Sequence, residues 1–128
     1  MSNTPNSFQQ GEHPAFDPSR LREATGGEPE FVKEIIELYI ADFTERTARL
    51  SKHLATLDFD AAHNELHTLK GSSGAIGAKQ LEWMFEATLE SLREGQFAQS
   101  QDLVQQLPTA FQHFLNHIQL IQQCGYAL

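Results

Sequence analysis

The sequence predicts an all-α protein, an antiparallel up-and-down four-helix bundle with a short extra helix at its N-terminal end. Three observations support this fold class. Apolar residues recur at helical spacing through most of the 128 residues, no segment shows the period-2 alternation of a strand, and short turns separate the helical segments. Short turns between long amphipathic helices require neighbouring helices to run antiparallel.

One domain accounts for the whole chain, because 128 residues are enough to bury a single core without metal or disulfide support. Residues 1–15 are polar and include Pro5, Gly11 and Pro14, so we expect a disordered N-terminal tail. Residues 16–128 carry the periodic apolar pattern and form the predicted four-helix bundle domain.

The short extra helix is expected at residues 18–24. Asp17 can cap its first turn, Pro18 suits the first helical position, and a Gly-Gly pair follows its end. The first long helix begins at Pro29 in the same way and extends to about residue 58. Its periodic apolar residues are Phe31, Ile35, Leu38, Tyr39, Phe43, Leu50, Leu54 and Leu57.

Three further helical segments complete the bundle. The second long helix covers residues 59–76, the third covers 78–94 and stops at Gly95, and the last covers 97–124 with Pro108 inside it. A proline at that position should kink the last helix or split it in two. The inward residues expected in these helices are Phe59, Ala62, Leu66, Leu69, Ile76, Leu81, Met84, Phe85, Leu92, Leu103, Leu107, Phe111, Phe114, Ile118 and Ile121.

The stretch LHTLKGSSGAIGA, residues 66–78, places three glycines where a helix is predicted, although each costs roughly 1 kcal/mol relative to alanine. At about 100° per residue, His67 points roughly 130° away from the centre of the apolar face of this helix. Gly71 follows one turn later and leaves the imidazole uncovered, with Lys70 alongside. An uncovered neutral imidazole is a nucleophile near pH 7, and lysine is a compact cation suited to a phosphoryl oxygen.

The segment HTLKGSSGAIGA resembles the signature of histidine-containing phosphotransfer (HPt) domains, the phosphoryl carriers of bacterial and fungal multistep phosphorelays. The segment FDPSRLREATGGEPEFVKEIIELYIADF resembles the short first helix and the first bundle helix of that family, and LEWMFEATLESLREG resembles the helix that packs on the histidine helix. The resemblance covers residues 16–124 and implies the same bundle fold.

By this resemblance, His67 is the phosphorylated histidine, and Nε2 of its ring carries the phosphoryl group. Lys70 matches the lysine that stabilises the charged group, and Gly71 matches the glycine that gives access to the ring. Glu86 falls where some members place a side chain that hydrogen-bonds the imidazole, and Arg93 falls where some place a basic residue near the phosphoryl group.

The resemblance also implies the partners, which are receiver domains of response regulators and hybrid histidine kinases. A receiver donates or accepts the phosphoryl group through an aspartate and brings its own Mg²⁺. We expect this chain to hold no cofactor or metal and, without a nucleotide site, to lack ATP-dependent kinase activity. Ile76, Leu89 and the short first helix are candidates for the docking surface, whereas Gly74 and Gly77 are assigned to helix packing.

Two other functions stay open on the sequence. His63 and His67, and again His113 and His117, are four residues apart on predicted helices, and four such histidines can bind zinc, copper or iron inside a bundle. The outward direction of His67 and His113 speaks against this metal site. The bundle can also be a docking module whose histidine carries no phosphoryl group.

The amino-acid composition limits the kinds of partner and the cellular compartment that we expect. The net charge of −8 argues against nucleic acid and anionic membranes as partners. Cys124 is the single cysteine, residues 1–14 do not resemble a signal peptide, and no apolar run approaches the roughly 18 residues of a membrane span. We expect a soluble, cytoplasmic protein that acts as a monomer.

Two further segments resemble known motifs only superficially. KGSSGAIGAK lacks the spacing of a phosphate-binding loop, and HNELH has its glutamate in the wrong place for a HExxH zinc protease.

Overall fold

The computed structural model describes residues 13–128, and within this range every regular element is an α-helix. In chain order the helices are α2 (Ser19–Thr25), α3 (Pro29–Ala55), α4 (Phe59–Ile76), α5 (Lys79–Arg93), α6 (Phe97–Gln105) and α7 (Leu107–Gln123). The predicted all-α fold class is confirmed, and the helices lie where the apolar periodicity placed them.

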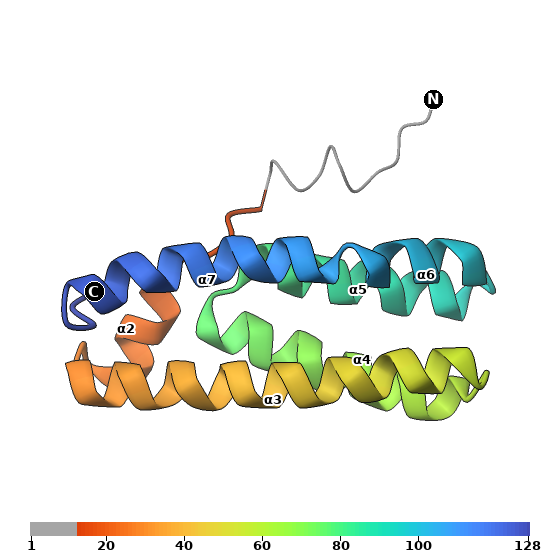
Figure 1. Ribbon diagram of the computed structural model, residues 1–128, viewed down its shortest axis with the longest axis horizontal. Helices are drawn as coiled ribbons and strands as arrows, with labels where there is room; N and C mark the ends of the chain where they lie inside the picture. The colour runs from red at the N-terminus through yellow and green to blue at the C-terminus, as the bar shows by residue number, and fades with distance from the viewer. Residues whose placement is uncertain (1–12) are drawn as a thin grey trace.

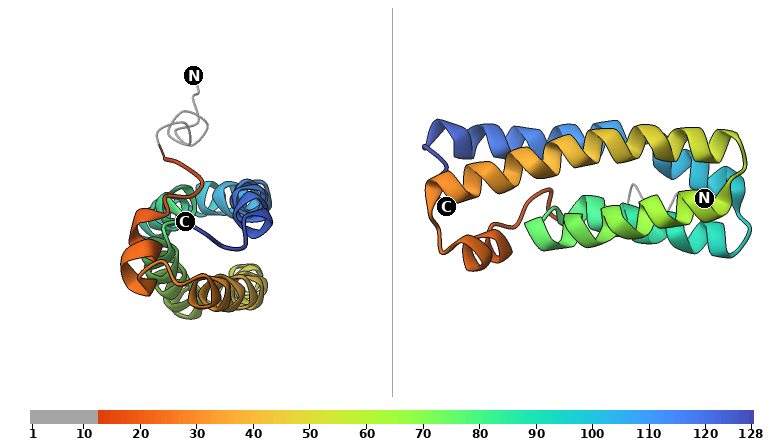
Figure 2. Two further views of the ribbon diagram at one scale, coloured as in Figure 1. Left: turned by 90° about the vertical axis from the view of Figure 1, so that its left-hand side faces the viewer. Right: turned by 90° about the horizontal axis from the view of Figure 1, so that it is seen from below.

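The helices α3, α4, α5 and the α6–α7 pair lie side by side along one long axis, each antiparallel to the one before it (Figure 1). Seen end-on, they occupy four corners in the order α3, α4, α5, α7, so that α4 and α7 are diagonal to each other (Figure 2). The short α2 contacts α3 and α4 and lies across the end of the bundle at which α3 begins. This is the predicted up-and-down bundle with its extra helix.

His13 and Pro14, which the sequence analysis assigned to the disordered tail, contact helix α5. Residues 1–12 of the predicted disordered tail lie outside the described residues. The ring of His13, however, stacks on Trp83 with the centroids 5.5 Å apart, and the Pro14 carbonyl accepts a hydrogen bond from the Gln80 backbone N–H at 3.0 Å. Contacts with α5 therefore begin before the predicted domain boundary.

Asp17 caps α2 as predicted. Its Oδ1 accepts hydrogen bonds from the backbone N–H of Ser19 at 3.0 Å and from the Ser19 hydroxyl at 2.9 Å. Pro18 occupies the N-cap position, one residue before the first helical residue. The short helix thus starts where an acceptor for its free N–H groups is available.

The buried face of α3 differs in part from the predicted one. Its buried residues are Val32, Ile36, Tyr39, Phe43, Leu50 and Leu54. Phe31, Leu38 and Leu57 were expected to point inward, but they are 48%, 64% and 61% exposed. Phe31 and Leu38 belong to a second apolar stripe beside the buried one, and helical periodicity does not tell which of two adjacent stripes meets the core. Phe59, also expected inward, is 45% exposed and packs edge-on against Phe97.

The last predicted helix is split in two. α6 ends at Gln105 and α7 begins at Leu107, with Pro108 in its first turn. Proline is tolerated there because the N–H groups of a first turn have no partner within the helix. Of the two predicted effects of Pro108, a kink or a split, the structure shows the split.

A cluster of charged side chains joins α3 to α4 around the buried carboxylate of Glu65. Arg46 Nη1 donates to Glu65 Oε1 at 3.0 Å, and Arg49 Nε donates to Oε2 at 2.8 Å. His53 Nε2 lies 3.8 Å from Oε2. The hydrogen bond from Arg49, with that from Arg46, lowers the pKa of Glu65 below its ordinary value of 4.5, although burial works in the opposite direction.

The E65Q variant should lose about 1.5–3 kcal/mol of stability near pH 7, because its amide cannot replace the charge-assisted hydrogen bonds of the carboxylate. The folded-state pKa is lowered, so the contribution of Glu65 is present above the unfolded-state value of about 4.5 and is lost as the pH falls through the folded value. Urea unfolding between pH 7 and pH 3 should show the two proteins converging in acid. E45Q is the matched control, since Glu45 is exposed and pairs with Arg49 at 3.5 Å. A constant difference across this pH range would contradict the assignment.

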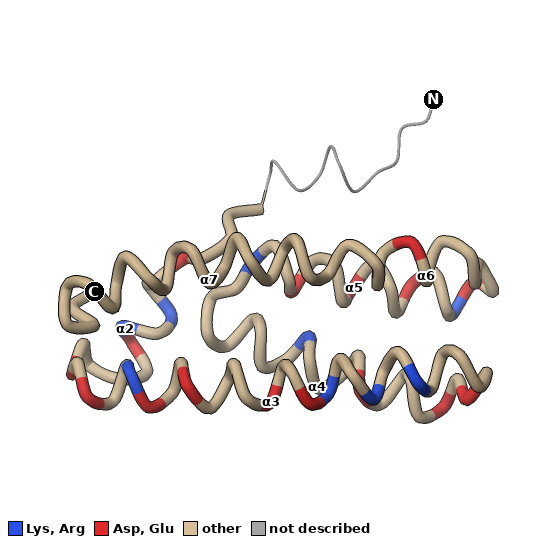
Figure 3. The backbone as a smooth tube through the Cα atoms, viewed as in Figure 1, with Lys and Arg blue, Asp and Glu red and all other residues tan. Residues whose placement is uncertain are grey.

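Acidic positions outnumber basic ones, in keeping with the net charge of −8, and they all precede α7, which carries no Asp, Glu, Lys or Arg (Figure 3). Within residues 13–128, no helix is both long enough and apolar enough to cross a membrane.

Candidate functional site

Helix α4 carries the segment with three glycines. The helix starts at a cap, because the Asp58 side chain accepts a hydrogen bond from the Ala61 backbone N–H at 3.2 Å. It continues without a break through Gly71 and Gly74 and ends at Gly77, whose φ of +91° is left-handed. The glycines therefore do not interrupt the helix before its natural end.

His67 lies on the outer face of α4. It is exposed, whereas its neighbours Leu66 and Leu69 are completely buried. The outward direction predicted for the imidazole is confirmed. One turn earlier, the ring of His63 lies parallel to that of His67, with the centroids 6.3 Å apart. The two histidines thus form an exposed row along α4.

Gly71, one turn beyond His67, faces open space. A Cβ atom placed there would have no neighbouring group within 4 Å. Packing inside this chain therefore does not require glycine at this position. What the missing side chain provides is free surface next to the imidazole, as predicted.

Gly77 is needed for packing, which confirms its predicted role, whereas Gly74 faces only the end of a flexible side chain. A Cβ atom at Gly74 would lie 2.6 Å from Oε2 of Glu82 on α5. A Cβ atom at Gly77 would collide with the backbone carbonyl oxygen of Asp17, and the Asp17 N–H donates to the Gly77 carbonyl at 2.8 Å. The close approach of the segment before α2 therefore accounts for Gly77, whereas a movement of the Glu82 side chain would make room for a Cβ atom at Gly74.

Ser73 holds α4 against α3. Its hydroxyl is buried and lies 2.7 Å from the Tyr39 hydroxyl, a hydrogen bond across the two helices. Burial raises the pKa of Tyr39, so this phenol stays protonated. This hydrogen bond helps to fix the position of α4 along its axis relative to α3, and therefore also the position of His67.

Lys70 and Glu86 form an ion pair between α4 and α5. Lys70 Nζ lies 2.6 Å from Glu86 Oε1, and both side chains are partly exposed. The resemblance placed Glu86 on the imidazole, but in residues 13–128 no hydrogen bond joins it to His67. The reason is the register of the two antiparallel helices, which is defined by the contacts of Lys70 with Glu86 and of Gly74 with Glu82. In this register His67 lies at the same level along the bundle as Leu89.

Arg93 is the last residue of α5, and its side chain is exposed. By the same register it lies level with His63, which is about 6 Å along the helix axis from the level of His67. No ion pair holds it within the described part of the chain. The structure thus brings His67, Lys70, Gly71 and Glu86 together and leaves Arg93 at the edge of the group.

The two residues named for docking are not on the surface. Ile76 and Leu89 are both 3% exposed, because each turns toward the core where its helix meets a neighbour. An apolar groove of about 330 Å³ lies instead between α2, α3 and α4, at the end of α4 beyond His67. It is lined by Leu21, Ala24, Ile35, Leu38, Tyr39, Asp42, Ser72, Ala75 and Ile76. Leu21 and Ala24 of the short helix line this groove together with Ile76, although Leu21 and Ile76 are almost fully buried.

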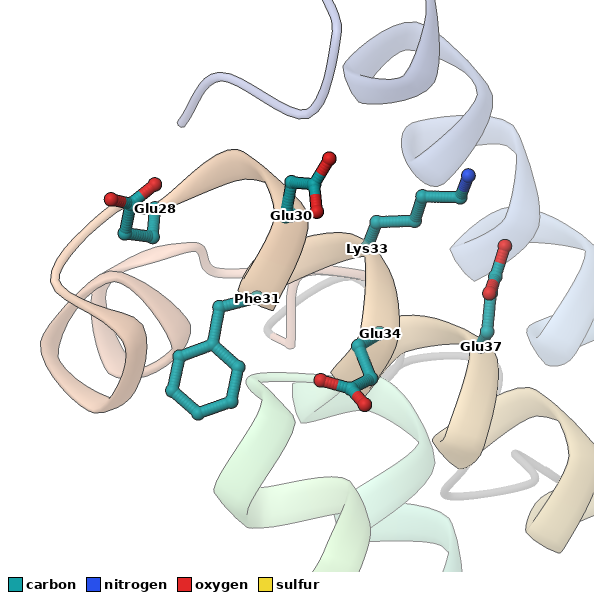
Figure 4. A pocket seen from close by; sticks show the side chains of 6 residues that line it. All are labelled: Glu28, Glu30, Phe31, Lys33, Glu34 and Glu37. Carbon is teal, nitrogen blue, oxygen red and sulfur yellow. The ribbon is translucent and has the colours of Figure 1, made fainter.

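A wide, shallow depression lies elsewhere, at the start of α3. It measures about 660 Å³ and is lined by Glu28, Glu30, Phe31, Lys33, Glu34 and Glu37. Figure 4 shows these side chains leaving one stretch of helix and pointing outward, with no common centre. It does not include His67, and its carboxylates would repel a phosphoryl group.

The arrangement of the histidines does not favour the metal alternative. His63 and His67 lie on α4, whereas His113 and His117 lie on α7, at the diagonally opposite corner of the bundle (Figure 2). All four side chains are exposed. Within the described range, no group of three or more histidine, cysteine or carboxylate side chains is placed to hold a metal ion.

Comparison with known families gives a match for most of the bundle. The family model described as the Hpt domain matches residues 34–118, which include His67, Lys70, Gly71, Glu86 and Arg93. This chain belongs to the Hpt domain family. The Hpt match also covers α4 and α5 completely, the two helices that carry these five residues.

Two plant proteins resemble part of this Hpt domain. It is 34% identical over 58 residues to histidine-containing phosphotransfer protein 2 of Arabidopsis thaliana, which is 43% of this chain and 37% of that protein. It is 36% identical over 55 residues to histidine-containing phosphotransfer protein 1 of Oryza sativa subsp. japonica, which is 41% of this chain and 37% of that protein. In each case the alignment spans little more than a third of the relative's length.

Proposed function

We propose that this Hpt domain is a phosphorelay intermediate that carries a phosphoryl group on His67. The group arrives from the phospho-aspartate of one receiver domain and leaves to the aspartate of another. The observation that carries the proposal is the exposed imidazole on α4, with open space over Gly71 and an ammonium group on Lys70. Membership of the Hpt family and the names of the two plant relatives support it.

The transfer itself is a displacement at phosphorus. The lone pair of His67 Nε2 forms the N–P bond while the P–O bond of the acyl phosphate breaks, and its electron pair leaves with the aspartate carboxylate. Such a step needs positioning and charge neutralisation, with little covalent machinery. Lys70 supplies positive charge on this side, and the receiver supplies its acidic pocket and Mg²⁺. Phosphoryl transfer to the second receiver is the same step in reverse.

Receiver docking is proposed at the apolar groove between α2, α3 and α4. Its apolar lining and its place on the same side of α4 as Gly71 support this choice, since Ala75 follows His67 by two helical turns. Leu38, at 64% exposed, is the most accessible large apolar side chain of the groove. A receiver seated there would have its catalytic face over the imidazole.

The test is to mix the full chain with phosphorylated receiver domains and to locate the phosphate by mass spectrometry. One phosphate on residue 67, lost in acid and stable in base, is the expected product. Incubation with Mg²⁺-ATP alone should give no label, and labelling by ATP alone would contradict a carrier without kinase activity. Binding of receivers without transfer would favour the docking module.

The G71Q variant should be more stable than the wild type and inactive in transfer. Glycine within a helix costs about 0.5–1 kcal/mol relative to alanine, and glutamine is nearly as good a helix former, so urea unfolding should show a gain of that order. The longer side chain would occupy the free surface beside His67, so the rate of transfer from a receiver should fall strongly. G71A is the control, with the same gain in stability and a much smaller loss of rate. Unchanged transfer in G71Q would remove the role of Gly71 in access.

A further inference from the structure

Lys70, the cation assigned to the phosphoryl group, already has a partner. Its Nζ lies 2.6 Å from Oε1 of Glu86. Water does not reach this carboxylate oxygen, and among the described residues it accepts no hydrogen bond from another donor. The ammonium of Lys70 is therefore the counter-charge of a partly exposed carboxylate, one oxygen of which is out of contact with water, when His67 carries no phosphoryl group.

A phosphoryl group on His67 would compete for the same ammonium. It brings a charge of about −1.5 to −2 near pH 7, and Lys70 is three residues along the helix, within reach of the same surface. When Lys70 turns to the phosphoryl oxygens, Oε1 of Glu86 loses its compensating charge. Leaving a shielded polar atom without its partner is unfavourable, so the gain at the phosphoryl group is partly offset by the loss at Glu86.

The surrounding charges act in the same direction. Glu82, Glu86 and Glu90 follow one another at intervals of four along α5. Glu82 lies against Gly74 and Glu86 pairs with Lys70, which places these two carboxylates beside α4. On α4 the facing groups are Lys70, His67 and His63. A phosphoryl group on His67 would thus meet one ammonium, with the carboxylates of Glu82 and Glu86 on the facing helix.

We propose that Glu86 is a competing counter-ion for Lys70 and that it shifts the transfer equilibrium of His67 away from the phosphorylated state. This assignment rests on the proposed carrier function and replaces the contact between Glu86 and the imidazole. The purpose of such competition is reversibility. A carrier that bound its phosphoryl group with the full strength of an unpaired lysine would release it less readily to the next receiver.

The experiment measures the equilibrium constant for phosphoryl transfer between one phosphorylated receiver and the full chain, with the wild type and E86Q side by side. E86Q keeps the shape of the side chain and removes its charge, so the constant should rise about two- to five-fold toward phospho-His67, the range expected for a partly exposed ion pair. E82Q is the matched control, because it removes a carboxylate of the same row that lies against Gly74 and not on Lys70, and it should raise the constant much less than E86Q does.

A second pair of variants tests whether Glu86 acts through Lys70. In a K70M background the E86Q change should raise the constant much less than in the wild type, which a double-mutant cycle shows directly. The effect in the wild-type background should also shrink at high salt. Equal gains with and without Lys70 would overturn the proposal, as would an equal or lower constant in E86Q.

Direct phosphorylation with phosphoramidate separates this inference from the proposed function. If neither phosphoramidate nor any receiver labels His67 in the wild type and E86Q, both the carrier function and the role of Glu86 are overturned. If His67 is labelled in both proteins to the same equilibrium extent, the carrier function stands and the role of Glu86 is overturned. Thermal unfolding of E86Q confirms that the variant is folded.

Discussion

The H67Q variant is expected to lose phosphoryl acceptance completely, the largest effect on activity that any single change should have. Transfer requires a ring-nitrogen lone pair that can attack phosphorus, and the carboxamide of glutamine offers no comparable nucleophile. His67 is exposed on α4, so the free energy of unfolding should change by no more than about 0.5 kcal/mol. The measurement is the intact mass of the protein after incubation with a phosphorylated receiver.

The control for this experiment is H63Q. His63 lies one turn before His67 on the same exposed row, with its ring parallel to that of His67, and it has the same intrinsic chemistry. H63Q should accept phosphate at a rate close to that of the wild type, because no glycine and lysine follow His63 as they follow His67. Phosphate on residue 63, or transfer that survives in H67Q, would show that the wrong histidine has been assigned.

The G77A variant is expected to show the largest loss of stability among the glycine positions, about 2–5 kcal/mol. Gly77 ends α4 with φ of +91°, where a side chain costs about 1–2 kcal/mol. A Cβ atom there would also collide with the Asp17 carbonyl oxygen, and relieving such overpacking costs a further 1–3 kcal/mol or so. The shift would disturb the hydrogen bond from Asp17 to Gly77, which leads the chain into α2. Urea unfolding of both proteins gives the difference.

The G95A variant separates the cost of a side chain at a left-handed φ from the cost of the collision with Asp17. Gly95 also has a left-handed φ, +76°, but a Cβ atom there would have no neighbour within 4 Å. Its substitution should cost only the backbone strain, about 1–2 kcal/mol. If G77A and G95A lost the same free energy of unfolding, the close contact with Asp17 would have no energetic importance.

The direction of His67 could be predicted from the sequence because it depends on a short stretch of chain. Leu66 and Leu69 define the buried face of α4, and the helical rotation per residue then turns His67 outward. The same local pattern predicted the division at Pro108 and the cap at Asp17. In each case a residue and its neighbours within a turn or two contain the necessary information.

Other predictions failed because they depended on the neighbours of a helix. Leu89 was named for docking, but α5 turns it into the core, and Ile76 is buried except where it lines the groove between α2, α3 and α4. Phe31 and Leu38 were named for the core, but α3 buries the adjacent stripe. Glu86 was assigned to the imidazole, but the register of α5 against α4 gives it to Lys70. The apolar periodicity of a sequence describes one helix at a time. It contains no information on how far that helix is shifted along its axis, or rotated about it, relative to a neighbouring helix.

The sequence by itself determined that this chain makes helices of these lengths and that one of them presents a bare histidine beside a glycine. Those features arise from propensity, capping and rotation within single segments, which neighbouring residues control. Only the tertiary structure decided that Lys70 is held by Glu86, that Gly77 meets Asp17, and that a groove opens between α2, α3 and α4. These contacts join residues far apart in the chain, and they follow from how complete helices pack to bury their apolar faces.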